Sequence, residues 1–117
     1  MQELPLTETT LLILISLTAG PRHGYAIMKD VQALSEQRIL LSTGTLYGAL
    51  KRLLEQDLIM RLDEGKNSNG SKRVRKLYTL TPTGQNLLQA ELDRLQKLLS
   101  LSRRRNIPVT AKANLQE

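Results

Sequence analysis

The chain of 117 residues has no cysteine, no tryptophan, no phenylalanine and a single histidine. The lack of cysteine excludes disulfides, zinc–thiolate sites, iron–sulfur clusters and cysteine nucleophiles. The single histidine, His23, excludes a metal site built from several histidines, and we expect neither a metal nor a cofactor. Since three tyrosines are the only aromatic residues, the core must be aliphatic.

Long hydrophobic runs are also missing. The longest hydrophobic run is Leu11–Ile15, followed by Ser16 and Leu17. It is far shorter than the roughly 18 residues expected of a membrane-spanning helix. The first eight residues lack the basic start and small-residue cleavage site of a signal peptide. No nucleophile–base pair or Walker-type phosphate loop is present, so we expect no catalytic residues and no enzyme. These absences predict a cytoplasmic protein of one small domain.

Charge is plentiful but unevenly spread. The net charge is +6, and residues 42–80 hold eight basic against four acidic side chains. Within that region, Gly65–Lys76 has five basic residues and no acidic one. Such an excess favours a polyanionic partner, although a basic cluster is equally compatible with a solvated surface. Only the local structural context can decide between these two interpretations of the basic cluster.

Capping residues and apolar spacing predict three helices in the first half of the chain. A Thr7 cap and a Gly20-Pro21 stop delimit a buried helix over residues 9–18. A second helix is expected over 23–34, on an apolar stripe that includes Tyr25, Met28 and Val31, with Ile27 and Leu34. The third begins at Ser42 or Thr43, and its buried side is Leu46, Leu50, Leu53 and Leu54.

Two glycines stand out in the third predicted helix. Gly44 and Gly48 weaken it intrinsically, by about 1 kcal/mol each relative to alanine. They indicate that the helix is stabilised from outside or needs the close approach that glycine allows.

After residue 57 the apolar period changes from 3.6 to 2. Two alternating segments, 58–63 and 74–80, flank a loop rich in Gly, Asn and Ser, which is typical of a long β-hairpin. Thr81-Pro82 then starts a helix that runs to about Arg104, roughly 34 Å at 1.5 Å per residue. We expect residues 106–117 to form a flexible tail.

The long helix carries leucines spaced four, three and four residues apart, a short heptad seam. The seam could fold back on the first helix of the same chain or pair with a second copy. Pairing is favoured because the helix is long and apolar for so small a chain. The residues predicted to form the dimer contact are Leu11, Leu14, Leu88, Leu92, Leu95 and Leu99.

This element order predicts a mainly α fold with a small β-hairpin: a winged helix-turn-helix domain (1–81) and a C-terminal dimerisation helix (82–105). In such a fold the third helix enters the major groove of DNA and the hairpin is the wing. The recognition-helix candidates for DNA contact are Ser42, Thr43, Thr45, Tyr47, Lys51 and Arg52. The wing candidates are Lys66, Lys72, Arg73, Arg75 and Lys76.

The remaining polar candidates have less specific roles. Tyr47 is assigned either to DNA contact and support of the third helix or to core packing. Tyr25 is expected mainly to pack, with its hydroxyl toward the DNA backbone. His23 is expected to be structural, and Arg103–Arg105 to stabilise the negative end of the long helix.

Five stretches resemble the PadR family of transcriptional regulators over about residues 6–100. They are residues 11–15 (LLILI), 21–27 (PRHGYAI), 42–47 (STGTLY), 50–55 (LKRLLE) with Leu58-Ile59, and 75–81 (RKLYTLT) with Gly84. Gly48 and Asp57 stand where the family commonly has Pro and Gly.

The resemblance implies a homodimeric repressor that uses its C-terminal helix to dimerise and whose DNA binding is relieved by a small-molecule effector. It also carries a DNA role onto Ser42, Thr43, Thr45 and Tyr47. A dimer would place two recognition helices about one DNA turn apart and require a near-palindromic operator. The alternative is a winged-helix protein–protein interaction module without specific DNA binding.

Overall fold

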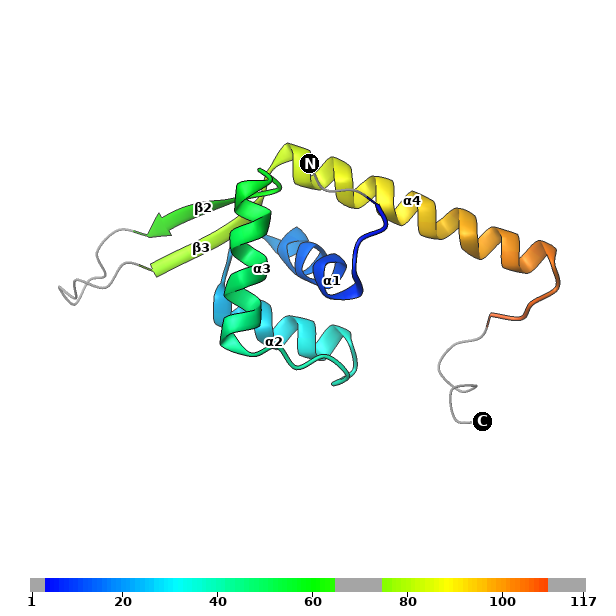
Figure 1. Cartoon of the computed structure of the whole chain (residues 1–117), viewed down its shortest axis with the longest axis horizontal. Coiled ribbons are helices and arrows are strands. Elements are labelled where there is room, and N and C mark those ends of the chain that lie inside the picture. Colours follow the sequence, from blue (N-terminus) through cyan, green and yellow to red (C-terminus); the bar gives the residue numbers. More distant parts are fainter. Residues whose placement is uncertain (1–3, 65–74, 110–117) are drawn as a thin grey trace.

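The computed structural model describes residues 4–64 and 75–109. It has the predicted order of three helices, a hairpin and a long C-terminal helix, so the winged-helix fold is confirmed (Figure 1). The helical elements are α1 (Glu8–Ser16), the short 3₁₀ helix η1 (Leu17–Ala19), α2 (Gly24–Leu34), α3 (Thr43–Glu55) and α4 (Pro82–Arg104). The strands are β1 (Arg22–His23), β2 (Ile59–Glu64) and β3 (Arg75–Leu80).

The core is aliphatic, as the composition predicts. Its most buried side chains come from α1, α2, α3 and β2 and include Ile13, Leu14, Ile27, Leu46 and Ile59, and one aromatic residue, Tyr78, joins them from β3. Because each helix presents one face to this centre, the other faces of α2 and α3 remain open to solvent.

The predicted stripe on α2 is wrong in part. Tyr25 is 68% exposed and Leu34 is 46% exposed, whereas Gly24, Ile27 and Val31 face the core. The buried stripe of α2 is therefore narrower than the apolar spacing indicated.

The sheet has a third strand that the sequence did not reveal. The strand order is β1-β3-β2, with Arg22 opposite Tyr78 and His23 opposite Leu77. Strand β1 has only two residues, too few to show a period. His23 Nδ1 lies 3.1 Å from the Lys76 carbonyl oxygen, a structural contact of the kind expected for this residue.

Helix α3 ends without glycine, and the residues that follow it are hydrogen-bonded to the start of α4 across the base of the hairpin. Asp57 has a left-handed φ of 60°, and its N–H donates to the Leu54 carbonyl while the Leu58 N–H donates to that of Leu53, which is a Schellman motif. Thr81, the N-cap of α4, donates its hydroxyl to the Asp57 carbonyl at 2.7 Å and its N–H to the Leu58 carbonyl at 3.1 Å. The end of α3 and the start of α4 are therefore joined.

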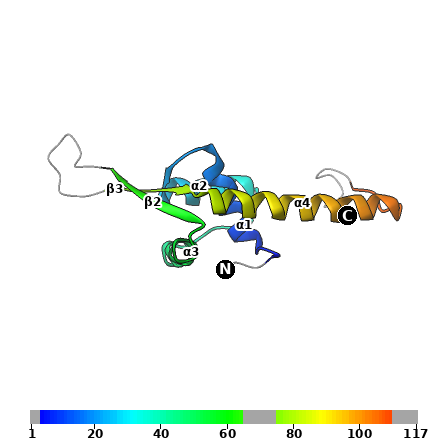
Figure 2. The same cartoon turned by 90° about the horizontal axis from the view of Figure 1, so that it is seen from above.

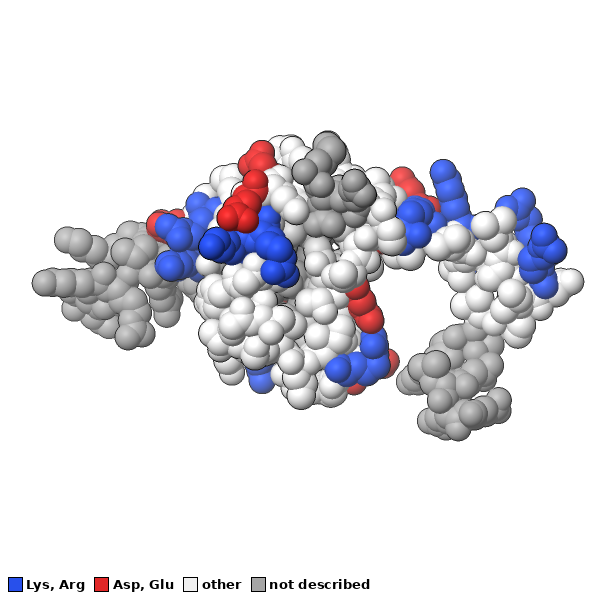
Figure 3. All heavy atoms as spheres, viewed as in Figure 1, with Lys and Arg blue, Asp and Glu red and all other residues white. Residues whose placement is uncertain are grey.

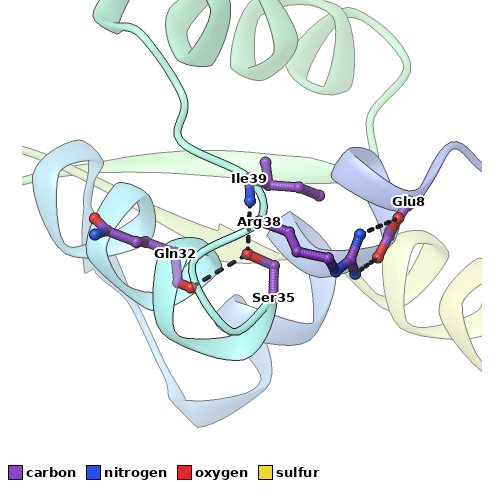
Figure 4. Close-up of polar contacts among 5 residues, drawn as sticks. All are labelled: Glu8, Gln32, Ser35, Arg38 and Ile39. Atoms are coloured by element: carbon purple, nitrogen blue, oxygen red, sulfur yellow. Dashed lines mark hydrogen bonds and ion pairs between the residues drawn. The ribbon is translucent and has the colours of Figure 1, made fainter. Parts of the chain in front are cut away.

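The turn between α2 and α3 is held by side chains (Figure 4). Ser35 is buried, donates its hydroxyl to the Gln32 carbonyl at 3.2 Å and accepts the Ile39 N–H at 3.0 Å. Arg38 makes two hydrogen bonds to the Glu8 carboxylate at the start of α1. These contacts fix the direction in which the chain enters α3.

A buried carboxylate ties the N-terminal segment to α4. Glu91 is 1% exposed. Its carboxylate accepts the Leu6 N–H at 2.9 Å and two hydrogen bonds from Arg94, at 2.6 and 3.0 Å. Neither this contact nor the packing of Leu6 in the core is visible in the sequence pattern, because the segment before Thr7 has no periodicity.

This carboxylate predicts acid sensitivity. Hydrogen bonds from Arg94 and from the Leu6 N–H hold the pKa of Glu91 below its ordinary value of 4.5. A carboxyl group whose pKa is lower in the folded protein than in the unfolded chain stabilises the fold at pH values above its pKa in the unfolded chain. That stabilisation is lost as the pH falls through its pKa in the folded protein. Glu91→Gln should therefore melt at a lower temperature than the parent at pH 7, with the gap closing below pH 4.5.

Thermal unfolding between pH 3 and pH 7 checks this prediction. Asp93→Asn, an exposed carboxylate on the same helix, is the control and should follow the parent at every pH. A gap between Glu91→Gln and the parent that does not depend on pH would contradict the assignment.

Helix α4 projects away from the domain on the side opposite the hairpin (Figures 1 and 2). Its first half packs on the core through Leu87 and Leu88, and Glu91 is the last of its buried residues. Beyond that point Leu92, Leu98 and Leu101 are 39–49% exposed. The helix is amphipathic, and no helix in the described part of the chain is long and apolar enough to cross a membrane.

Candidate nucleic-acid interface

The start of α3 presents hydroxyl groups to solvent. Ser42 is the N-cap, accepts the Thr45 N–H at 3.1 Å and donates to the Thr45 hydroxyl at 2.9 Å. Ser42, Thr43, Gly44 and Thr45 are all exposed. A helix N-terminus carries partial positive charge and free N–H groups, so this end suits phosphate oxygens or the acceptor edges of bases.

The second half of α3 adds positive charge on the same outer face. Lys51 and Arg52 are exposed, and neither forms an ion pair with any residue in the described ranges. Basic side chains gather over this part of α3 next to the hairpin, whereas the start of the helix is uncharged (Figure 3). The outer face of α3 therefore combines neutral hydrogen-bonding groups with exposed basic side chains.

Tyr47 is neither fully exposed nor part of the core. Its side chain is 43% exposed and packs over Gly24, where an added Cβ would lie 2.9 Å from the Tyr47 Cζ atom. Glycine at position 24 thus allows α2 and α3 to meet through this ring. Tyr47 therefore packs α3 against α2 and keeps part of its side chain exposed to solvent.

Tyr25 is a correction to the sequence prediction. Its ring is on the surface of α2, not packed, and the Lys29 Nζ lies 5.9 Å from the ring centroid. Lys29 was not predicted, because one lysine on the polar side of a helix has no distinguishing signal. Tyr25 and Lys29 extend the exposed polar surface from α3 onto α2.

The wing is described only in part. Lys66, Lys72 and Arg73 lie outside the described residues, and for Arg75 the structure gives only its place in β3. Lys76 is exposed, opposite Asp63 in the hairpin register. On β2, Arg61 makes a 3.0 Å ion pair with Asp63, so it is less available to a partner than Lys76.

The six predicted dimer residues fall into two groups. Leu14 is 0% exposed and Leu88 is 5% exposed, and Leu11 packs against the same core. Leu14 and Leu88 therefore stabilise the subunit from inside and cannot face a partner in this fold. Leu92, Leu95 and Leu99 retain exposed surface on the projecting half of α4.

A small sheet with a protruding hairpin, an exposed third helix and a long C-terminal helix together define a winged helix-turn-helix protein. The model of the transcriptional regulator PadR-like family matches residues 13–90. The chain belongs to this family.

Solved structures agree with this assignment. A PadR family transcription regulator from hypervirulent Clostridium difficile is 28% identical with a TM-score of 0.69, covering 84% of this chain and 97% of that one. Bacillus subtilis PadR in complex with operator DNA is 26% identical with a TM-score of 0.61, covering 71% of this chain and 46% of that one.

A curated relative is much longer than this chain. An uncharacterized 37.1 kDa protein in transposon TN4556 of Streptomyces fradiae is 36% identical over 91 residues. The match spans 78% of this chain but only 24% of that protein.

Proposed function

We propose that the chain is a sequence-specific DNA-binding transcriptional repressor that acts as a homodimer on a near-palindromic operator. The observation that carries this proposal is the outer face of α3, with exposed Ser42, Thr43 and Thr45 at its start and beyond them Lys51 and Arg52, which form no ion pair with the residues that the structure describes. In this proposal α3 contacts base edges while Lys76 and the other basic residues of the wing bind phosphates. The operator complex of Bacillus subtilis PadR supports it.

The projecting half of α4 supports the homodimer. Its leucines are not part of the core cluster, and an isolated helical segment of this length is only marginally stable in water. A second copy of α4 would cover Leu92, Leu95 and Leu99 and stabilise both helices. Residues 1–81 then form the DNA-binding unit and residues 82–105 the dimerisation helix.

Footprinting on the DNA upstream of the gene, followed by binding measured against salt concentration, tests the proposal. Lys51→Ala with Arg52→Ala should weaken operator binding at least tenfold and reduce the slope of log affinity against log salt by about 1 to 2. Lys97→Ala, an exposed lysine on α4, is the control and should change neither quantity. Binding that is absent, or independent of salt, would refute a DNA-binding function.

The competing function is a protein-interaction module that uses the same surfaces. Charge reversal at Lys66, Lys72 and Arg73 separates the two functions. A repressor should lose DNA binding after the reversal, whereas an interaction module should lose its protein partner. Relief of repression by a small-molecule effector is the remaining part of the proposal.

Gly44 gives a prediction in which stability and binding move in opposite directions. An added Cβ would meet no atom within 4 Å, so the fold itself does not require glycine here. Gly44→Ala should stabilise the protein by about 0.5–1 kcal/mol, because alanine favours the helix. It should weaken operator binding about tenfold, because a methyl group holds the start of α3 away from the groove.

Chemical denaturation and fluorescence anisotropy with labelled operator measure the two effects. A Gly44→Ala protein that gains stability and binds the operator as tightly as the parent would show that no close backbone approach occurs at this residue.

A further inference from the structure

One face of the hairpin carries charges of both signs. Tyr78 of β3 is 3% exposed and packs in the core. The register places Arg61 opposite Tyr78, and it places Asp63 opposite Lys76. Residues directly opposite each other, and residues two apart on one strand, lie on the same face of a sheet. Arg61, Asp63 and Lys76 therefore share the face of Tyr78, and all three are exposed where the hairpin leaves the core.

This face of the hairpin lies beside α3. Strand β2 packs against α3. Burial raises the pKa of the Tyr78 hydroxyl above its ordinary value of 10.0, Tyr47 on α3 raises it further, and Arg61 on β2 opposes the rise, so these three groups lie near one another. In Figure 3 the basic side chains over α3 are followed by others at the hairpin, with acidic atoms among them. A DNA backbone that passes beside α3 would therefore meet this face of the hairpin.

Arg61 and Asp63 form an ion pair through two contacts. The Arg61 Nε atom lies 3.0 Å from Asp63 Oδ1, and Arg61 Nη2 donates to Asp63 Oδ2 at 3.3 Å. The fork of a guanidinium group fits two oxygens of a phosphate as well as it fits a carboxylate. Each side chain is 43% exposed, so water and salt screen the pair and a phosphate can replace the carboxylate.

We propose that Arg61 binds a phosphate of the DNA backbone and that Asp63, its partner in the free protein, competes with that phosphate. This inference rests on the proposed function and adds a residue that opposes it. When a phosphate takes the guanidinium group, the Asp63 carboxylate loses its partner and is repelled by the DNA. A phosphate contact carries no sequence information, so the affinity for operator and for unrelated DNA falls by the same factor. Asp63 therefore limits how tightly the protein holds DNA of any sequence.

Asp63→Asn in the full-length protein tests the competing carboxylate, because it removes the charge and keeps the size of the side chain. Fluorescence anisotropy measures binding to the operator duplex and to a duplex of the same length and random sequence. The variant should bind both duplexes about threefold more tightly or better, by equal factors. Asp93→Asn, an exposed carboxylate on α4, is the matched control and should leave both affinities unchanged.

Arg61→Ala tests the phosphate contact and is made in the Asp63→Asn protein, so that no carboxylate is left without its partner. It should weaken binding to both duplexes about threefold or more and reduce the slope of log affinity against log salt by about 1. Arg61→Lys in the same protein keeps the charge and should keep the slope. Lys97→Ala, an exposed lysine on α4, is the control for the loss of one positive charge. A slope that Arg61→Ala leaves unchanged overturns the proposal.

The two duplexes separate this inference from the proposed function. If the parent prefers the operator but Asp63→Asn binds neither duplex more tightly, the inference fails and the proposed function stands. If Asp63→Asn gains affinity for the operator alone, Asp63 acts on base recognition and the inference is overturned. If the variants behave as expected but the parent binds both duplexes equally, only sequence-specific repression is refuted. A parent that binds neither duplex overturns both.

Discussion

Gly84→Ala should destabilise the protein by about 3 kcal/mol or more, a loss large enough to unfold much of a small domain. Gly84 is buried in the first turn of α4 and lies against Leu58, the residue that precedes β2. A Cβ at this position would overlap the Leu58 carbonyl oxygen and lie 2.9 Å from its carbon. Both are backbone atoms, and the Thr81 N–H already holds that carbonyl, so no side chain can move aside.

Unfolding by urea measures this loss, with Gly44→Ala as the matched substitution. The two glycines lie in the first turns of α4 and α3, yet the added methyl meets backbone at position 84 and open space at position 44. The two variants should therefore shift the urea midpoint in opposite directions. A loss below 1 kcal/mol for Gly84→Ala would show that α4 can move relative to Leu58 at little cost.

The elements that could be predicted are those whose ends carry local signals. Thr7, Ser42 and Thr81 each accept the N–H three residues on, as their residue types predict for helix N-caps. Pro82 marks the start of α4 and the change to a period of two marks the hairpin. These signals depend on neighbouring residues only, so one sequence was enough to place them.

The features that could not be predicted depend on contacts between distant segments. Strand β1 exists because two residues pair with β3, and Glu91 is buried because it accepts the N–H of Leu6, 85 residues away. Tyr25 shares the spacing of a core residue, yet it is 68% exposed. A period shows which residues share a face, but the packing decides how wide the buried part is.

The candidate site shows the same division. The exposure of Ser42, Thr43, Thr45, Lys51 and Arg52 follows from the helical period and the buried leucines on the other side of α3. Lys29 joins this surface only when α2 is placed beside α3. The prediction from the leucine seam was limited in the same way. A heptad spacing does not show whether a leucine packs in the core of its own subunit or against a partner subunit.

Leu95→Glu with Leu99→Glu should convert the proposed dimer to a monomer and lower operator affinity at least a hundredfold. Both leucines lie on the projecting half of α4, outside the core cluster, so the winged domain should stay folded. Two carboxylates in a leucine seam face their own copies across the interface, where burial and like charge both oppose pairing. A monomer holds only one half-site, so the free energy from the second recognition helix is lost.

Light scattering gives the mass, circular dichroism the fold, and anisotropy the operator affinity. The matched control is Gln89→Glu with Gln96→Glu, which adds the same charge at exposed positions of α4 away from the seam. The control should remain a dimer and lose operator affinity only by the smaller effect of added negative charge. If the leucine variant keeps the mass of the parent, α4 is not the dimerisation helix. If it is a monomer that still binds the operator tightly, then one winged domain suffices and no near-palindromic operator is required.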